Sequence, residues 1–104
     1  MENIKIEVQY FTGCPNSEKA LEMVKAYISK SEFNIHFSEI LVETHEDAEK
    51  FKFRGSPTIL IDGNDLESLE ENRTPSLSCR YYQNGLPTEQ NLQDFIISKK
   101  ISTK

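Results

Sequence analysis

Cysteine is scarce in this sequence, with two residues in a chain of 104. So few cysteines exclude a small scaffold that is held together by several disulfides. Long hydrophobic runs are missing as well. No segment approaches the ~20 apolar residues of a membrane-spanning helix, and the amino terminus lacks the basic and apolar stretches of a signal peptide. We therefore expect a cytoplasmic protein with reduced thiols and no membrane partner.

Positive charge is also in short supply. Lysine and arginine number 12 against 17 acidic residues, which gives a formal net charge of -5. A general nucleic-acid-binding protein presents a basic face, so we expect no nucleic-acid partner. His36 and His45 are isolated and the two cysteines are far apart, whereas a structural zinc site needs about four ligands. We therefore expect no resident metal or other cofactor.

The length of the chain predicts a single domain over residues 1–104. Apolar and polar residues alternate over residues 4–10, which is the period of a strand. The apolar residues between Ala20 and Ile28 then follow the spacing of an amphipathic helix, and Pro15 suits the first turn of that helix.

The remaining segments predict further strands and helices, separated by a surface loop. They are a strand within residues 34–42, a short helix within 45–53, a buried strand over 58–61, an acidic loop over 64–76, a fourth strand over 79–82, and a last helix with Thr88 as its N-cap. The order βαβαββα indicates an α/β fold with a central four-stranded mixed sheet and helices on both faces.

Cys14 stands where the first strand gives way to the first helix. A sulfur at the start of a helix faces unpaired N–H groups and the positive end of the helix dipole, and both favour a thiolate. Ser17 can offer the sulfur a hydroxyl hydrogen bond, but it cannot form a disulfide. The alternative is that Cys14 is only a small residue at a tight turn, since most buried cysteines carry no chemistry.

Two motifs resemble the thioredoxin-like superfamily: "GCPNS" over residues 13–17 and "SPT" over residues 56–58. The likeness extends from residue 4 to about residue 99. With "CRYY" at residues 79–82, the motifs are more closely similar to a group of small single-domain proteins, some loosely labelled as alkylmercury-lyase-related. The resemblance implies a thioredoxin-like fold, with Cys14 as the attacking cysteine and Pro57 as a cis-proline lying against it.

The sequence departs from the thioredoxin pattern at Ser17, which replaces the second cysteine of Cys-x-x-Cys. A dithiol cycle within the motif is therefore excluded. Cys79 is the other thiol, and whether it reaches Cys14 depends on the path of loop 64–76. A disulfide would need the two Cα atoms to lie within about 7 Å. The alternative is that Cys79 is a buried strand residue. If Cys79 is exposed, the adjacent Arg80 favours its thiolate.

The resemblance implies a thiol protein that performs thiol–disulfide exchange through Cys14, with Cys79 or an external thiol resolving the mixed disulfide. Ser17 would stabilise the thiolate, and Pro57 would shape a groove for a thiol- or disulfide-containing protein or a small thiol. Phe53 and Arg54 are candidates to flank that groove. Two alternatives stay open: a binding module without catalytic activity, and a soft-metal site made of two thiolates.

Overall fold

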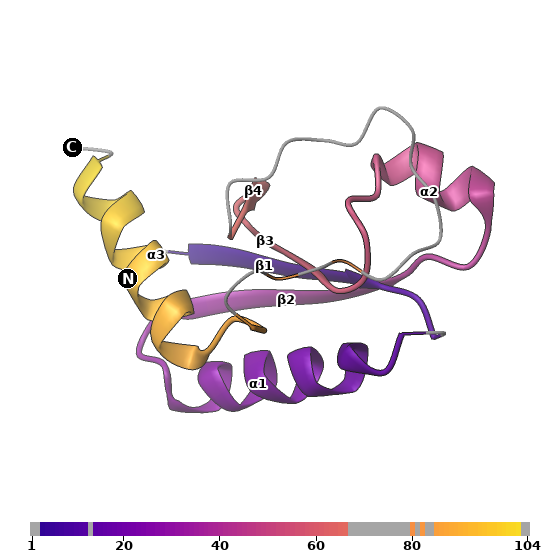
Figure 1. Ribbon diagram of the computed structural model, residues 1–104. Helices are drawn as coiled ribbons and strands as arrows, with labels where there is room; N and C mark the ends of the chain where they lie inside the picture. The colour runs from indigo at the N-terminus through magenta and orange to yellow at the C-terminus, as the bar shows by residue number, and fades with distance from the viewer. Residues whose placement is uncertain (1–2, 13, 67–79, 81, 83–84, 103–104) are drawn as a thin grey trace.

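A computed structural model describes residues 3–12, 14–66, 80, 82 and 85–102 of the chain. Its strands and helices follow one another in the order βαβαββα (Figure 1). They are β1 (Asn3–Tyr10), α1 (Asn16–Lys30), β2 (Asn34–Leu41), α2 (His45–Phe51), β3 (Thr58–Ile61), β4 (Asn64–Asp65) and α3 (Glu89–Ser102).

The four strands form one sheet in the order β2-β1-β3-β4. β1 pairs parallel with β2, and α1 makes the crossover that a parallel pair requires. β3 pairs antiparallel with β1 and with β4. The predicted α/β fold with a four-stranded mixed sheet flanked by helices is therefore confirmed.

The fourth strand of the sheet is not the predicted one. Asp62 and Gly63 both have positive φ angles, 51° and 84°, and they form a two-residue hairpin loop. Such loops match the twist of paired strands, so the chain returns at once and β4 pairs with β3 at Asn64–Asp65. Arg80 and Tyr82, the described residues of the predicted strand over 79–82, do not belong to a strand.

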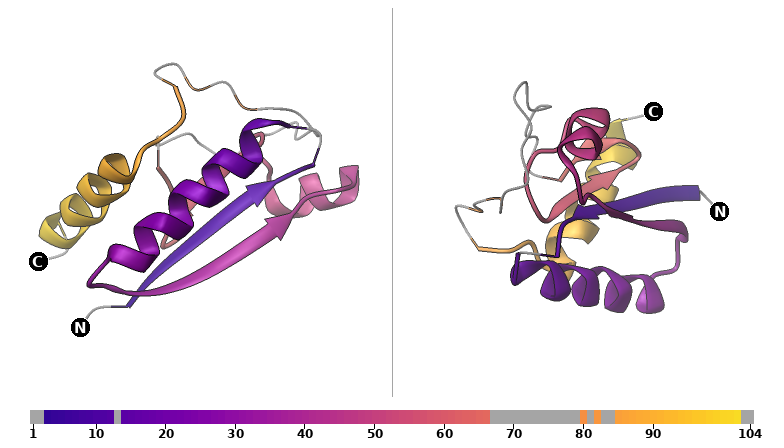
Figure 2. Two further views of the ribbon diagram at one scale, coloured as in Figure 1. Left: turned by 90° about the horizontal axis from the view of Figure 1, so that it is seen from below. Right: turned by 90° about the vertical axis from the view of Figure 1, so that its right-hand side faces the viewer.

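One face of the sheet is apolar. Ile4, Ile6 and Val8 of β1 are buried there at 4% exposure or less, in a cluster with Val24 of α1 and Leu92 of α3. α2 lies on the opposite side of the sheet from α1 (Figure 2), and it has a smaller apolar cluster of its own. The alternation seen in the sequence of β1 thus directs its apolar side chains to the main core.

The other face of β1 carries polar side chains. Gln9 is 2% exposed, and its side-chain amide donates to a carboxylate oxygen of Glu7 over 2.7 Å. Its own Oε1 atom is buried without a hydrogen-bond partner among the described residues. In the sheet register Glu7 lies opposite Leu60, and Leu60 lies opposite Asp65. Side chains at these positions share this second face of the sheet.

The last helix begins as predicted. The Thr88 hydroxyl accepts from the Asn91 amide over 3.2 Å, and the Asn91 side chain accepts from the Thr88 amide over 2.9 Å. This reciprocal cap satisfies N–H groups at the helix start.

Among the described residues, we find no helix with the length and apolar character needed to cross a membrane.

Candidate functional site

Cys14 lies directly before Pro15, the N-cap residue of α1. Its side chain is buried, with 3% of the residue exposed. The thiol donates a hydrogen bond to the backbone oxygen of Ser56, with 3.3 Å between sulfur and oxygen. This contact is one that a protonated thiol makes, because a thiolate has no proton to donate to a carbonyl. In this structure Cys14 is a covered thiol at the start of a helix.

The loop that covers Cys14 contains the Ser56–Pro57 peptide bond, which is cis. Both residues are buried. The Ser56 oxygen that receives the thiol also accepts the backbone amide of Arg80 over 2.8 Å. The Pro57 oxygen accepts the hydroxyl of Tyr82 over 2.6 Å. The structure therefore brings Cys14 and Pro57, two of the predicted site residues, to the same loop.

Ser17 is buried in the same place, at 3% exposure. Its hydroxyl donates to the Phe11 oxygen over 3.1 Å and lies 2.8 Å from the Ser56 hydroxyl, which accepts the Phe11 amide. Each hydroxyl has one proton. The Ser17 proton goes to Phe11, so the proton between the two serines comes from Ser56. The contacts of Phe11, Ser17 and Ser56 close a ring, which we call the serine ring.

The serine ring corrects the role predicted for Ser17. We expected its hydroxyl to donate to the Cys14 sulfur, but its single proton is directed to the Phe11 oxygen. The hydroxyl instead fastens the start of α1 to the loop before β3. The reason is geometric: from the first turn of α1, the Ser17 hydroxyl lies within hydrogen-bond distance of the Phe11 oxygen and the Ser56 hydroxyl.

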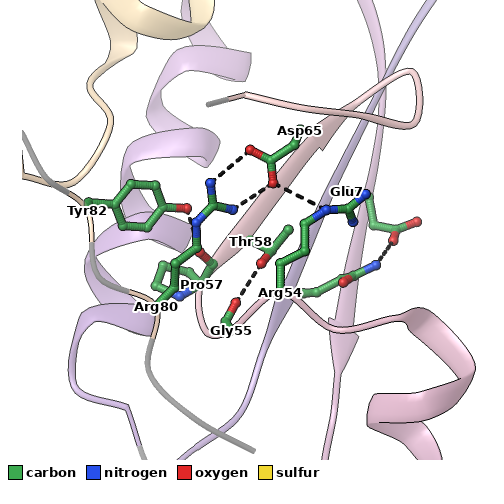
Figure 3. Close-up of polar contacts among 9 residues, drawn as sticks. Glu7, Arg54, Gly55, Pro57, Thr58, Asp65, Arg80 and Tyr82 are labelled. Atoms are coloured by element: carbon green, nitrogen blue, oxygen red, sulfur yellow. Dashed lines mark hydrogen bonds and ion pairs between the residues drawn. The ribbon is translucent and has the colours of Figure 1, made fainter. Parts of the chain in front are cut away.

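Cys79, the predicted resolving cysteine, lies outside the described residues. Its neighbour in the chain, Arg80, is described and has a buried side chain that reaches β4 (Figure 3). The two terminal nitrogens of its guanidinium donate to the two carboxylate oxygens of Asp65 over 2.6 and 2.8 Å. This two-pronged geometry is the strongest arrangement that an arginine and a carboxylate form.

Arg54 approaches the same carboxylate, with 3.7 Å between its Nε atom and Asp65 Oδ2. The side chains of Asp65, Arg80 and Arg54 are 1%, 6% and 9% exposed. We call these three residues the Asp65 cluster. Sequence analysis missed Asp65, because it lies in a run of acidic residues and 15 positions before its partner. No periodic pattern connects two such positions.

Arg80 and Tyr82 pack closely on the loop that holds Ser56. Gly55 has a φ of +107°, and a Cβ atom placed there would lie 2.8 Å from the Cβ of Arg80. Only glycine combines this backbone angle with so close an approach. The guanidinium of Arg80 also lies over the ring of Tyr82, 4.6 Å from its centre. We call Arg80 and Tyr82 together the clamp.

The predicted groove at Phe53 and Arg54 is not formed by these side chains. Phe53 is fully buried and packs with Val42 and Ala48, so the expectation that it flanks a groove is wrong. Lys52 ends α2 in the left-handed conformation, with φ 51°, and the Phe53 amide donates to the Ala48 oxygen. This turn directs Phe53 inward, while Arg54 belongs to the Asp65 cluster.

Two other features bear on possible ligands. Among the described residues, no three histidine, cysteine or acidic side chains are grouped so that they could hold a metal ion.

A pocket of about 360 Å³ lies between the end of α1 and the start of α3, and Lys30 and Glu89 are in its wall. Tyr27 also lines this pocket and donates to Gln93 over 2.6 Å. Burial raises the pKa of Tyr27 above its usual value of 10.0.

Comparison with known proteins assigns neither a family nor a function to this chain. A scan against protein-family models finds no match to this sequence, and no curated protein matches it. Any function must therefore be argued from the contacts around Cys14.

Proposed function

We propose that this protein is thioredoxin-like, related to the small group that the motifs resemble, and that it performs thiol–disulfide exchange through Cys14. The observation that carries the proposal is one shared acceptor. The Ser56 oxygen binds both the thiol of Cys14 and the amide of Arg80, and Arg80 follows Cys79, the other cysteine of the sequence. The mixed sheet and the place of Cys14 before α1 also support it.

The reaction has two steps that balance in atoms and electrons. Cys14 first loses its proton to water, and its thiolate then attacks a substrate disulfide, forms a mixed disulfide and releases one substrate thiolate, which takes up a proton from water. A second thiol then attacks the Cys14 sulfur and releases the other substrate sulfur as a thiol. If Cys79 is the second thiol, the substrate is reduced and the protein keeps a Cys14–Cys79 disulfide. Two molecules of a small thiol such as glutathione, abundant in the cytoplasm, reduce that disulfide and leave as one oxidised, disulfide-linked molecule.

Burial sets a requirement for this reaction. With 3% of Cys14 exposed, a substrate disulfide reaches the sulfur only after the contacts over it open. The Ser56 oxygen, which accepts from the Cys14 thiol and from the Arg80 amide, and the serine ring hold the region closed. We expect the rate of attack to report this opening, because regions that expose a buried group do so through local fluctuations.

The test uses oxidised glutathione with the full chain, followed by acid quenching and mass spectrometry without reductant. The Cys79→Ser variant is expected to accumulate a glutathione adduct on Cys14. In the unsubstituted chain the same adduct is expected to form and then disappear. Either it is converted to an internal disulfide, or an added thiol removes the glutathione from Cys14. The control is Cys14→Ser, which forms no internal disulfide. Failure of Cys14 to react in the folded Cys79→Ser variant, despite full reaction in denaturant, overturns the proposal.

The burial of Cys14 favours a second candidate, a binding module that keeps the fold and has no thiol chemistry. In that case the thiol is one more small buried group, and the hydrogen bond to Ser56 is structural. The same experiment separates the two candidates, because a binding module predicts no reaction with oxidised glutathione below the unfolding transition. Its partner would bind Cys14→Ser as well as the unsubstituted chain.

A further inference from the structure

We propose that Asp65 is a positioning residue for the first step of the reaction. Through Arg80 it holds the loop at Ser56 against Cys14, and it thereby limits how often a substrate disulfide reaches the sulfur. The inference rests on the proposed exchange activity, because the exposure of Cys14 matters only if its thiol reacts. It adds to the Cys14 site a residue that neither sequence motif contains.

The loop at Ser56 is fastened by two sets of contacts. The first is the serine ring, which ties the Ser56 hydroxyl to the start of α1. The second is the clamp. The Ser56 oxygen accepts the Arg80 amide over 2.8 Å, and the Pro57 oxygen accepts the Tyr82 hydroxyl over 2.6 Å. Two consecutive carbonyl groups of the loop are therefore bound by the clamp.

The two sets of contacts differ in how they can open. Ser17 belongs to α1, so the serine ring separates only if the first turn of that helix moves. Arg80 and Tyr82 belong to no strand or helix. The clamp can therefore leave the loop without breaking a hydrogen bond within the sheet or within a helix. Such segments open locally at a lower free energy than the packed elements around them.

Asp65 fastens the clamp to the sheet. Its two carboxylate oxygens accept from the two terminal nitrogens of Arg80 over 2.6 and 2.8 Å (Figure 3). The Asp65 side chain is 1% exposed, so water hardly competes for these oxygens. Asp65 lies in β4, opposite Leu60 of β3, and all four residues of β3 are buried. Arg80 is therefore bound to a packed part of the molecule.

The effect of Asp65 reaches Cys14 through one atom. The Ser56 oxygen accepts the Cys14 thiol over 3.3 Å as well as the Arg80 amide. The missing Cβ of Gly55 lets the Arg80 backbone lie close to the loop. When Arg80 leaves, the Ser56 oxygen loses a donor and Gly55 loses a packing partner. The loop is then freer to move away from the sulfur, which is 3% exposed while the loop is in place.

The expected consequence is a faster first step when the attachment is weakened. Asparagine in place of Asp65 keeps the shape, but it offers one acceptor oxygen and no charge. Lysine in place of Arg80 keeps the charge but offers a single point of attachment. Either change increases the fraction of molecules in which Cys14 is exposed. The rate of reaction with an external reagent rises with that fraction.

The experiment measures the labelling of Cys14 by iodoacetamide in the reduced full chain, in the unsubstituted form, Asp65→Asn and Arg80→Lys. The sulfur displaces iodide and its proton goes to water, so no disulfide chemistry is involved. Peptide mass spectrometry follows the labelled fraction of Cys14 with time. We expect Asp65→Asn to speed the labelling by about ten- to a hundredfold, because hydrogen bonds to charged groups are strong. Arg80→Lys is expected to speed it less, and it provides the test if Asp65→Asn does not fold.

Urea separates local opening from global unfolding. Urea acts in proportion to the surface that an opening exposes, so labelling through a local opening changes little at low urea concentrations. We expect the faster labelling of Asp65→Asn to keep this shallow dependence below the unfolding transition. The double variant tests whether Asp65 acts through Arg80. If it does, Asp65→Asn with Arg80→Lys labels no faster than Asp65→Asn alone.

Two controls separate positioning from stability. Ile6→Val lowers the stability of the apolar face without touching the Asp65 cluster, and we expect its Cys14 to be labelled at the unsubstituted rate in the absence of urea. Glu39→Gln removes one negative charge from an exposed ion pair with Lys25, and it is also expected to leave that rate unchanged. A rise in either control as large as that in Asp65→Asn would overturn the inference.

The outcomes distinguish this inference from the proposed function. If Asp65→Asn and Arg80→Lys are labelled at the unsubstituted rate, or faster only in step with global unfolding, the role of Asp65 is wrong. The exchange activity still stands if oxidised glutathione forms its adduct on Cys14. If Asp65→Asn is labelled faster but Cys14 forms no glutathione adduct in the folded chain, the exchange activity is wrong and the hold of Asp65 on Cys14 stands. If Cys14 reacts with neither reagent in any folded variant, both proposals fail.

Discussion

The two faces of the sheet are built on opposite principles. Toward α1 and α3, Ile4, Ile6 and Val8 of β1 are buried among apolar side chains. Toward the other side, β1 presents Lys5, Glu7 and Gln9 (Figure 3 shows Glu7), and the Asp65 cluster lies on that face. The first face is held by apolar burial, which has no preferred direction. The second combines the small apolar cluster of α2 with charged contacts that have fixed partners and angles.

The difference teaches which face can position a reactive group. An apolar core tolerates substitutions of similar volume, because its stabilising energy is spread over many weak contacts. A buried ion cluster does not, since removing one member leaves charges with high desolvation cost. The loop at Ser56, against which Cys14 lies, is attached to the polar face through Arg80. Three predictions compare the faces, from the largest expected effect to the smallest.

Asp65→Ala gives the largest effect. The substitution removes the carboxylate from between two buried guanidinium groups, and the free energy of unfolding is expected to fall by about 3–5 kcal/mol. Urea denaturation followed by circular dichroism measures it. Glu39→Gln, in the exposed pair with Lys25, is the matched control and is expected to change little. A loss below about 1 kcal/mol for Asp65→Ala would mean that the cluster is not a buried anchor.

Ile6→Val tests the apolar face. Ile6 is fully buried, and removing one methylene group from it is expected to lower the free energy of unfolding by about 0.5–1.5 kcal/mol. Ile97→Val, at a side chain that is 41% exposed, is the control and is expected to cost less. The same urea titration applies. A loss as large as that of Asp65→Ala would contradict the contrast between the faces.

Tyr27→Phe gives the smallest effect, at the polar edge of the apolar face. Burial raises the pKa of Tyr27 above 10.0, so the folded chain keeps the phenol proton at a pH where the unfolded chain releases it. The stability from this group is therefore fully present below about pH 10 and is lost as pH rises through the folded-state pKa. Unfolding measured between neutral and alkaline pH is expected to show a shallower decline for Tyr27→Phe. Equal slopes would contradict the assignment.

The strong periodic patterns of the sequence predict most of the fold. The alternation before Tyr10 gives β1, the spacing after Pro15 gives α1, and Thr88 caps α3 as expected. β4 could not be predicted in this way, because a strand of two residues is too short to show an alternating pattern. It exists because the Asp62–Gly63 turn sends the chain back along β3. The same turn ends β3, the buried strand that the sequence did predict over residues 58–61.

The candidate site is predictable only where a motif names its members. The motifs place Cys14 and Pro57 together, and the structure brings both to one loop. The partners of Ser17 and of Arg80 could not be foreseen, because each depends on which atoms of distant segments face one another after folding. Hydrogen-bond direction and buried charge pairing are properties of the assembled chain, and residue spacing does not encode them.

The serine ring also bears on how this sequence can change over evolution. Replacing Ser17 by cysteine would create a second thiol in the motif in a single step. A thiol, however, is a weaker donor and acceptor than a hydroxyl, so that step would weaken the bonds that join α1 to Phe11 and Ser56. The loss of stability would precede any gain in chemistry. In this chain, the hydrogen bonds of Ser17 therefore oppose its replacement by cysteine.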